Sequence, residues 1–225
     1  RKEQLQPKKP VIAYSCITTH LHMPKDQRFG QAAILSSEQL QELCNSFPVG
    51  QHKYISLVLA FSGARVSEVL ALQWRDIKED CILFKSINTK TKQSREIVLH
   101  PTLKKHLKDW KEKYWYQFPL LNKNKRNAEW RAPTPDCFLF KGRKKNTHLS
   151  RQSFDKQLRA QLDYLMLEGS STHSFRRSNL TAAKDAGLAL SDIMRISGHT
   201  SLDALNKYLA PNQKEMKKVV STFGF

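Results

Sequence analysis

The sequence predicts a mainly α-helical protein with one small antiparallel β-sheet, an α+β fold. Apolar residues recur at helical spacing along most of the chain after residue 33. One pair of short β-rich runs, at 81–84 and 95–99, flanks a polar turn. With 225 residues, of which 40% are hydrophobic, the chain is long enough to bury a core in one or two domains.

Residues 1–33 are predicted to form a linker or arm. Lysines and prolines cluster between Pro7 and Pro10, and helical periodicity is weak throughout this stretch. The chain begins with Arg1 rather than Met, so we expect a fragment whose N-terminal partner is missing. Regular structure is predicted to begin at Ile34.

Two helices are predicted before residue 63. Ser36 and Ser37 suit the N-cap of a helix through Cys44, because a serine hydroxyl accepts from the unpaired N–H groups of the first turn. The run 52–62 is strongly apolar and typical of a buried helix. We expect it to end at Gly63, since glycine adopts the left-handed conformation that closes many helices.

A third helix and a hairpin are predicted next. Apolar residues at helical spacing indicate a helix over Val66–Gln73. The β-rich runs 81–84 and 95–99 are joined through a lysine-rich turn at Asn88–Gln93, which is typical of an antiparallel hairpin.

The second half of the chain is predicted to be helical, with two irregular stretches. Pro101 starts a helix to about Phe118, the Asn-, Pro- and Lys-rich stretch 119–135 is a surface excursion, and 138–140 is a short extended piece before the basic loop Lys141–Lys145. Further helices are expected at about 151–167, 173–186, 189–196 and 202–209. A last segment, Gln213–Thr222, carries an apolar stripe that no later chain covers, so we expect it to dock on a neighbouring protomer.

The chain is strongly basic, with a formal net charge of +18. Such an excess of Lys and Arg favours a polyanionic partner such as nucleic acid, with binding that weakens steeply as salt rises. A merely basic protein, for example one associated with ribosomes, is the alternative. An anionic membrane is disfavoured, because the sequence has no long apolar run and no basic amphipathic stretch with a lipid-facing stripe.

The cysteines and acidic residues give no sign of a metal site. The 4 cysteines are far apart and form no CxxC pair, so they match neither a zinc site nor a dense disulfide framework. No clustered Asp/Glu pair is apparent, and neither a metal nor another cofactor is predicted. With no visible signal peptide or membrane span, we expect an intracellular protein, cytoplasmic or associated with the nucleoid.

The stretch 172–209 carries the residues best suited to chemistry. His173 and Arg176 lie one helical turn apart, His199 follows a glycine, and Tyr208 comes later on a short amphipathic helix. Each alone would more often serve a helix end, an ion pair or the core. Together they favour phosphodiester chemistry, because a phenol can attack phosphorus where cations stabilise the charge of the transition state.

A further cation, Arg65, lies in the turn between two predicted helices. The glycine-terminated turn can direct Arg65 toward a ligand near a helix N-terminus, a place that favours phosphate. Guanidinium groups suit this role, because their planar fork binds phosphate oxygens bidentately and stays charged. An ordinary exposed arginine paired with Glu68 at i, i+3 is the alternative.

Four segments in this order resemble the conserved boxes of the tyrosine recombinases, which include phage integrases and Xer-type resolvases. Gly63–Ile77 resembles the first arginine box, His173–Arg176 the His-x-x-Arg box, and Ser197–Ser201 the Gly-His segment, while Tyr208 falls where the nucleophile is expected. The resemblance covers about residues 34–220 and implies a fold like the catalytic domain of that family. One box would be weak evidence, but four in order at compatible spacing are specific.

The resemblance implies a role for each matching residue. Arg65 and Arg176 would clamp the nonbridging oxygens of the scissile phosphate, and His199 would hydrogen-bond to it. His173 would assist proton handling at the nucleophile. Tyr208 would form a 3′-phosphotyrosyl bond, which conserves the bond energy so that a 5′-hydroxyl can rejoin the strand.

The family also uses a lysine on the hairpin turn as general acid toward the leaving 5′ oxygen. Lys90 fits that place best, and Lys92 is the competitor, because the turn lacks the glycine that usually follows the lysine. Glu68 or Asp76 is expected to support Arg65 or the fold rather than to react. Additional basic residues are expected to contact DNA, namely Lys92, Arg95, Lys141, Arg143, Lys144, Lys145 and Arg177.

The resemblance also implies domains and partners. Residues 1–33 would link to a missing N-terminal DNA-binding domain, residues 34–211 would form the catalytic domain, and residues 212–225 would dock on a neighbouring protomer. The expected partners are double-stranded DNA, further copies of the chain in a tetramer on synapsed DNA, and accessory DNA-bending proteins. No membrane partner is expected.

The chain departs from the family pattern at three places. Arg177 stands where histidine is frequent, Ser197 where leucine usually precedes Gly-His, and Ser62 where threonine is frequent. None of these changes removes a catalytic side chain, so an active, metal-independent site-specific recombinase is expected, serving integration or excision of a mobile element. The rival functions are a DNA-binding regulator without catalysis, a type IB topoisomerase and a telomere-resolving enzyme.

Overall fold

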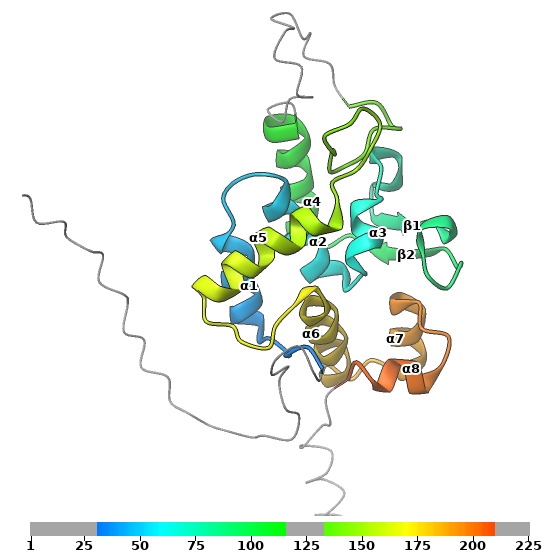
Figure 1. The fold of residues 1–225 in the computed structure, drawn as a ribbon. Coiled ribbons are helices and arrows are strands. Elements are labelled where there is room, and N and C mark those ends of the chain that lie inside the picture. The colour runs from blue at the N-terminus through cyan, green and yellow to red at the C-terminus, as the bar shows by residue number, and fades with distance from the viewer. Residues whose placement is uncertain (1–30, 116–132, 210–225) are drawn as a thin grey trace, which may run out of the picture.

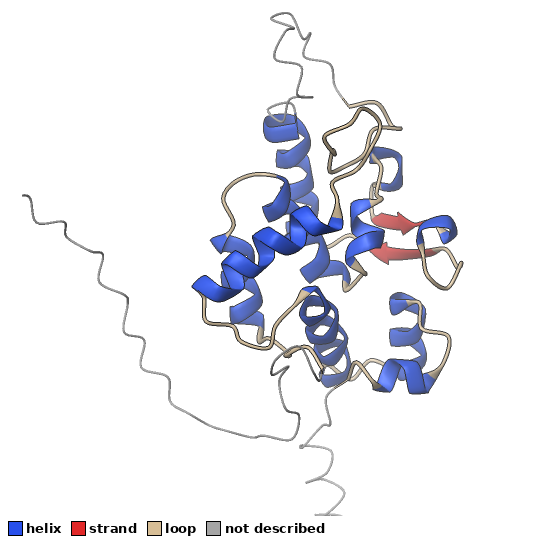
Figure 2. Ribbon diagram, viewed as in Figure 1, coloured by secondary structure: helices blue, strands red, loops and turns tan. Residues whose placement is uncertain are grey.

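The computed structural model describes residues 31–115 and 133–209, and within them it is mainly helical with one two-stranded antiparallel sheet. Figure 2 shows the helices surrounding the molecule's centre and the pair of strands at one edge. The predicted fold class is confirmed. The predicted arm up to residue 30, most of the excursion 119–135 and the segment Gln213–Thr222 lie outside the described residues.

The larger group of helices forms the main core. Its members are α1 (Ser37–Ser46), α2 (Gln51–Ser62), α3 (Val66–Leu70), α4 (Pro101–Asp109), α5 (Arg151–Tyr164) and α6 (Thr172–Asp185). Helix α2 lies among the others and packs against each of them (Figure 1). Its apolar side chains Ile55, Val58 and Leu59 are fully buried, as the apolar run 52–62 predicted.

Local sequence signals fix the ends of the first two helices. The Ser36 hydroxyl accepts from the Gln39 backbone N–H at 3.2 Å, and the Gln39 side-chain oxygen accepts from the Ser36 N–H at 2.9 Å, which completes a capping box. Helix α2 ends at Gly63, which has φ +58° and donates its N–H to the Leu59 carbonyl at 3.0 Å. Both predicted boundaries are confirmed.

Gly63 also permits a close approach between α2 and α6. A Cβ atom built at this position would lie 2.6 Å from the Asn179 Oδ1 atom. We therefore expect Gly63→Ala to lower the free energy of unfolding by about 1–3 kcal/mol in urea denaturation, from the left-handed backbone and the contact together. Gly187→Ala is the matched control, because Gly187 has φ +85° but nothing within 4 Å of its added Cβ. Equal losses in the two variants would mean that the Asn179 contact is unimportant.

Helix α3 is shorter than predicted, because backbone pairing takes over after Leu70. The Leu72 carbonyl accepts from the Leu139 N–H at 2.8 Å, and the Trp74 N–H donates to the Cys137 carbonyl at 3.1 Å. A β-bridge joins Gln73 to Phe138 between these bonds. The piece predicted to be extended at 138–140 therefore takes part in backbone pairing. Its partner is the stretch 72–74, whose start the periodicity had assigned to the helix Val66–Gln73.

The sheet joins β1 (Cys81–Phe84) to β2 (Arg95–Val98) in antiparallel register, with Cys81 opposite Val98 and Phe84 opposite Arg95. Burial alternates along both strands, and Arg95 lies on the same buried face of β2 as Ile97. The connection contains a 3₁₀ turn at Ser86–Asn88 and is closed by the Thr89 hydroxyl, which donates to the Gln93 carbonyl at 3.0 Å. The predicted hairpin is confirmed.

A smaller group of helices lies beside the sheet, with α7 (Leu190–Ser197) and α8 (Leu202–Asn206) following α6 (Figure 1). A separate apolar cluster holds it together, made of Leu180, Ile193, Leu205 and Leu209. Helix α7 packs against both α6 and β2, which brings the end of α7 close to the start of α3. No helix in the ranges 31–115 and 133–209 is long and apolar enough to cross a membrane.

Two predicted helices differ from their periodicity toward their C-terminal ends. The helix predicted from Pro101 to about Phe118 changes after Asp109 to a π-helical turn at Trp110–Tyr114, and its last three predicted residues lie outside the described residues. Helix α5 ends at Tyr164, two residues before Met166, whose positive φ of 53° reverses the chain. These endings do not alter the positions of the site residues, which lie on other elements.

Candidate active site

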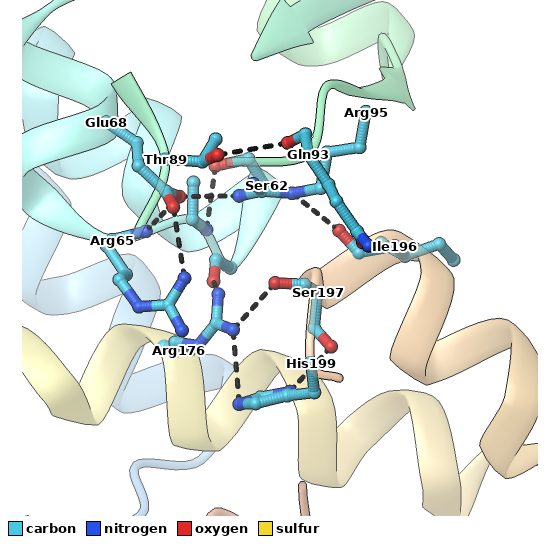
Figure 3. Close-up of polar contacts among 12 residues, drawn as sticks. Ser62, Arg65, Glu68, Thr89, Gln93, Arg95, Arg176, Ile196, Ser197 and His199 are labelled. Atoms are coloured by element: carbon cyan, nitrogen blue, oxygen red, sulfur yellow. Dashed lines mark hydrogen bonds and ion pairs between the residues drawn. The ribbon is translucent and has the colours of Figure 1, made fainter. Parts of the chain in front are cut away.

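Arg176 lies at the centre of a buried polar cluster between α6, the start of α3 and the end of α7 (Figure 3). Its side chain is only 1% exposed. The guanidinium donates from Nη1 to the Gly63 carbonyl at 2.9 Å and from Nη2 to the Ser197 carbonyl at 2.7 Å. Burial and the nearby Arg65 lower its pKa to about 10, which still leaves it charged at neutral pH. Three distant chain segments therefore meet at one cation.

A single buried carboxylate supports two more arginines beside it. Glu68, 1% exposed, accepts from Arg65 Nη1 at 3.0 Å and from Arg95 Nη2 at 2.5 Å. Its Oε2 also accepts from the Arg65 backbone N–H at 3.0 Å. Burial alone would raise the pKa of Glu68, but the hydrogen bond and charge of Arg95, with those of Arg65, lower it below the usual range. Glu68 is therefore ionised and holds both guanidinium groups in place.

The cluster as a whole is cationic, because three guanidinium groups share this one carboxylate. The clearest consequence is at His199, which is 8% exposed beside Arg176. Burial, followed by the charges of Arg176, Arg65 and Arg95, lowers the pKa of His199 to about 4. An environment that opposes a further positive charge this strongly is suited to binding an anion.

The ring of Tyr208 lies against this cluster, just beyond the end of α8. Its centroid is 5.0 Å from that of His199 and 6.3 Å from that of His173, and the Arg176 Cζ atom lies 5.4 Å from it. The structure thus brings together the four residues that the sequence singled out in the stretch 172–209. A phenol beside buried guanidinium groups is the arrangement needed to attack a phosphate that those groups bind.

Comparison with known proteins identifies the family. The sequence model of the phage integrase family matches residues 34–215, which is most of the chain. The chain belongs to the phage integrase family. This tyrosine recombinase domain is 24% identical over 177 residues to two provisionally named integrase/recombinases of Sinorhizobium fredii, y4qK and y4eF. The match covers 78% of this chain but only 51% and 63% of those relatives, so the chain spans little more than half of their length.

Solved structures of tyrosine recombinases share the fold of this phage integrase domain. The XerA recombinase superposes with a TM-score of 0.62 at 18% identity, covering 85% of this chain and 65% of that one. XerH in a post-cleavage complex with palindromic difH substrate gives a TM-score of 0.64 at 20% identity, covering 84% and 52%. A λ integrase dimer bound to a COC′ core site gives 0.57 at 15% identity, covering 80% and 48%.

Two residues of the integrase domain that the sequence assigned to DNA contact lie inside the protein instead. Arg95 is 8% exposed, donates from Nε to the Ile196 carbonyl at 2.9 Å and packs over the Phe84 ring. Arg177 is 4% exposed and donates to the Tyr208 carbonyl at 3.2 Å and to the Ala32 carbonyl. Their guanidinium groups are therefore occupied by partners within the protein, and contact of Arg95 or Arg177 with DNA stays a prediction.

The two arginines instead support the candidate active site. Arg95 connects Glu68 to the end of α7, and Arg177 holds the backbone of Tyr208. Sequence reasoning missed the role of Arg95, although the alternation of β2 contained the signal, since Arg95 lies two residues before Ile97 on the inward face. No local signal marks the contact between Arg177 and Tyr208, which are 31 positions apart.

The remaining predicted DNA contacts are more accessible. Arg143, Lys144 and Lys145 are exposed on the loop after the Leu139 pairing. Lys141 differs from them, since its ammonium lies 3.5 Å from the centroid of the Trp115 ring and burial lowers its pKa. Lys90 and Lys92 are both exposed on the connection between the two strands. Among the described residues, no group of three or more His, Cys, Asp or Glu side chains is placed to hold a metal ion.

Proposed function

We propose that this chain is the catalytic domain of a site-specific DNA recombinase that cleaves and rejoins strands through a 3′-phosphotyrosyl intermediate on Tyr208, without a metal ion. The observation that carries the proposal is the position of the Tyr208 ring against Arg176, His199 and His173. Membership of the phage integrase family supports it. The proposed biological role is the integration or excision of a mobile element.

In the proposed reaction the Tyr208 phenolate attacks phosphorus and the bond to the 5′ oxygen breaks. Arg65 and Arg176 bind the nonbridging oxygens, where negative charge increases in the transition state, and His199 donates a further hydrogen bond. His173 receives the phenol proton. Because one phosphodiester bond replaces another, the step conserves bond energy, and attack by a second 5′-hydroxyl reverses it on a new strand.

Covalent trapping tests this function. The protein would be incubated with nicked, fragmented DNA from its source in excess chelator and then denatured in detergent. We expect protein linked to DNA for the wild type and none for Tyr208→Phe, which lacks only the phenol oxygen. Sequencing the attached DNA would identify the target site. A preparation that is folded and binds DNA but forms no adduct, even with its upstream domain restored, would contradict the proposal.

The leaving 5′ oxygen needs a proton, which we assign to Lys90. We expect Lys90→Ala to lower the cleavage rate about 10²–10⁴-fold, the usual contribution of a general acid. A substrate with sulfur in place of the 5′ oxygen should restore the rate, since a thiolate leaves without protonation. Lys92→Ala is the matched control on the same connection. If Lys92→Ala were instead the variant that sulfur rescues, the assignment would move to Lys92.

We also propose that the domain acts on double-stranded DNA as a tetramer, with residues 1–33 leading to an upstream DNA-binding domain and residues 212–225 docking on a neighbouring protomer. Intracellular action at the nucleoid with accessory DNA-bending proteins fits this scheme. A cavity of about 980 Å³ between β2, α6 and α7, lined in part by Ala183, Ile193 and Met194, is the proposed acceptor for that segment.

Removal of residues 212–225 is expected to weaken assembly while DNA binding stays measurable. The truncated chain keeps the basic surface that binds DNA but loses the apolar stripe of the segment Gln213–Thr222. The measurement is the molar mass of protein–DNA complexes by light scattering on the DNA recovered by trapping. An unchanged oligomer after truncation would rule out this docking.

A further inference from the structure

His199 is held through both of its ring nitrogens. Nδ1 lies 2.7 Å from the Ser197 hydroxyl oxygen, and Nε2 lies 3.3 Å from Nη2 of Arg176. Ser197 is 1% exposed and His199 is 8% exposed, so both side chains are largely buried. Gly198 between them has φ +70°, a left-handed turn that brings the two side chains together at the end of α7 (Figure 3).

The partners of His199 determine which nitrogen carries the proton. A guanidinium group can only donate, so Nε2 must accept from Arg176. A neutral imidazole then carries its proton on Nδ1 and donates it to the Ser197 oxygen. The imidazole is neutral at pH 7 because burial and the surrounding arginines lower its pKa to about 4.

The hydrogen bond that the Ser197 hydroxyl donates in this arrangement is weak. The hydroxyl oxygen lies 3.3 Å from the Met194 carbonyl oxygen, to which it donates. That carbonyl already accepts from the backbone N–H groups of Gly198 at 2.8 Å and His199 at 3.2 Å, which use its two lone pairs. The hydroxyl therefore loses little if it rotates away from Met194 to donate elsewhere.

A bound phosphate changes what Nε2 must do. If a phosphate oxygen takes the Arg176 N–H that His199 now shares, the Nε2 lone pair faces an anion, and only an N–H at this position is favourable. Gaining a second proton would make His199 a cation next to Arg176 of α6, Arg65 at the start of α3 and Arg95 of β2. The charge of Glu68 opposes their effect only in part, and the Tyr208 ring also lies against His199. Moving the existing proton from Nδ1 to Nε2 avoids that cost.

We propose that Ser197 is a positioning residue that lets His199 exchange tautomers when phosphate binds, an inference that rests on the proposed function. One proton leaves Nδ1 and one arrives at Nε2 through water, with no net proton uptake. Ser197 then donates its hydroxyl proton to Nδ1 across the same 2.7 Å contact, and Nε2–H donates to the phosphate. A side chain without a hydroxyl at position 197 can neither accept from Nδ1–H in the free protein nor donate to Nδ1 in the phosphate-bound protein.

Nitrogen-15 NMR of the histidine side chains tests the exchange directly, with inorganic phosphate as the probe. The His199 signals would be assigned by their loss in His199→Gln. We expect the Nδ1–H tautomer in the free protein and the Nε2–H tautomer at saturating phosphate. Three results would overturn the inference: an Nε2–H tautomer in the free protein, an imidazolium in the phosphate-bound protein, or no response of His199 to phosphate.

Variants of Ser197 separate positioning from folding. In Ser197→Ala, Nδ1 has no hydroxyl partner in either tautomer, so the His199 signals should not show the complete change to the Nε2–H tautomer at saturating phosphate that the wild type shows. Ser197→Thr keeps the hydroxyl and should behave as the wild type. Ser56→Ala is the matched control, because it removes an equally buried hydroxyl that donates to the Lys53 carbonyl instead. A complete change of tautomer in Ser197→Ala at saturating phosphate would contradict the proposal.

These measurements do not require the protein to cleave DNA. If the protein shows the tautomer exchange but forms no Tyr208 adduct, the inference about His199 stands and the proposed function is contradicted. If the protein forms the adduct but the tautomer of His199 does not change with phosphate, the proposed function stands and the inference about His199 is contradicted.

Discussion

Arg176→Ala is expected to lower the rate of DNA cleavage by about 10²–10³-fold while reducing DNA affinity less than tenfold. Arg176 is buried beside Tyr208, so in the proposed reaction it acts where charge develops on the nonbridging oxygens, and it is not part of the exposed surface that attracts DNA from solution. Removal of one preorganised donor at such a position costs mainly transition-state stabilisation. Single-turnover cleavage and equilibrium binding on the trapped DNA site measure the two effects separately.

The same variant also loses structural contacts, and this must be controlled. Arg176 donates to the carbonyls of Gly63 and Ser197, so alanine leaves two buried acceptors without that partner and is expected to lower stability. Arg176→Lys keeps a positive charge but not the planar fork, and should still cleave slowly. Arg195→Ala removes the same charge from an exposed position on α7 and should change neither rate nor affinity. Equal losses of cleavage and binding in folded Arg176→Ala would assign Arg176 to positioning the DNA only.

The sequence predicted those parts of the fold that local signals determine. The Ser36 cap and the Gly63 terminus lie where they were expected, because capping depends on a few neighbouring residues. Helix α3 was predicted too long because its continuation pairs with residues 137–139, more than 60 positions later, and periodicity within 66–73 carries no information about that partner. Tertiary pairing overrode local preference there.

The candidate site likewise combines residues that the sequence could predict with contacts that it could not. Arg65, Arg176, His199 and Tyr208 could be proposed from type, order and spacing, and the pair Arg65–Glu68 is a local i, i+3 contact. The second partner of Glu68, Arg95, is 27 positions away, and the contact between Arg176 and Gly63 spans 113. Arg95 and Arg177 were assigned to DNA contact from their charge alone, because the sequence does not show which charged side chains are buried in the folded protein.

Glu68→Gln is expected to lower the free energy of unfolding by about 3–5 kcal/mol at pH 7, the range for breaking a buried ion pair on one side. Glutamine preserves the shape of the side chain but removes the charge that compensates Arg95, which is 8% exposed, and Arg65. The uncompensated guanidinium groups would then be buried next to Arg176. Urea denaturation of wild type and variant measures the difference, and Glu96→Gln on the exposed face of β2 is the matched control.

The pH dependence of that difference identifies the carboxylate as its source. The pKa of Glu68 is lower in the folded protein than its ordinary value of 4.5, so its contribution to stability is complete above pH 4.5 and is lost as the pH falls through the lowered folded pKa. The difference in the free energy of unfolding between wild type and Glu68→Gln should therefore be constant at neutral pH and become smaller below about pH 4.5. A gap that persists undiminished in acid would mean that glutamine disturbs packing at this position, and that the charge of Glu68 is not what holds the two arginines in the site.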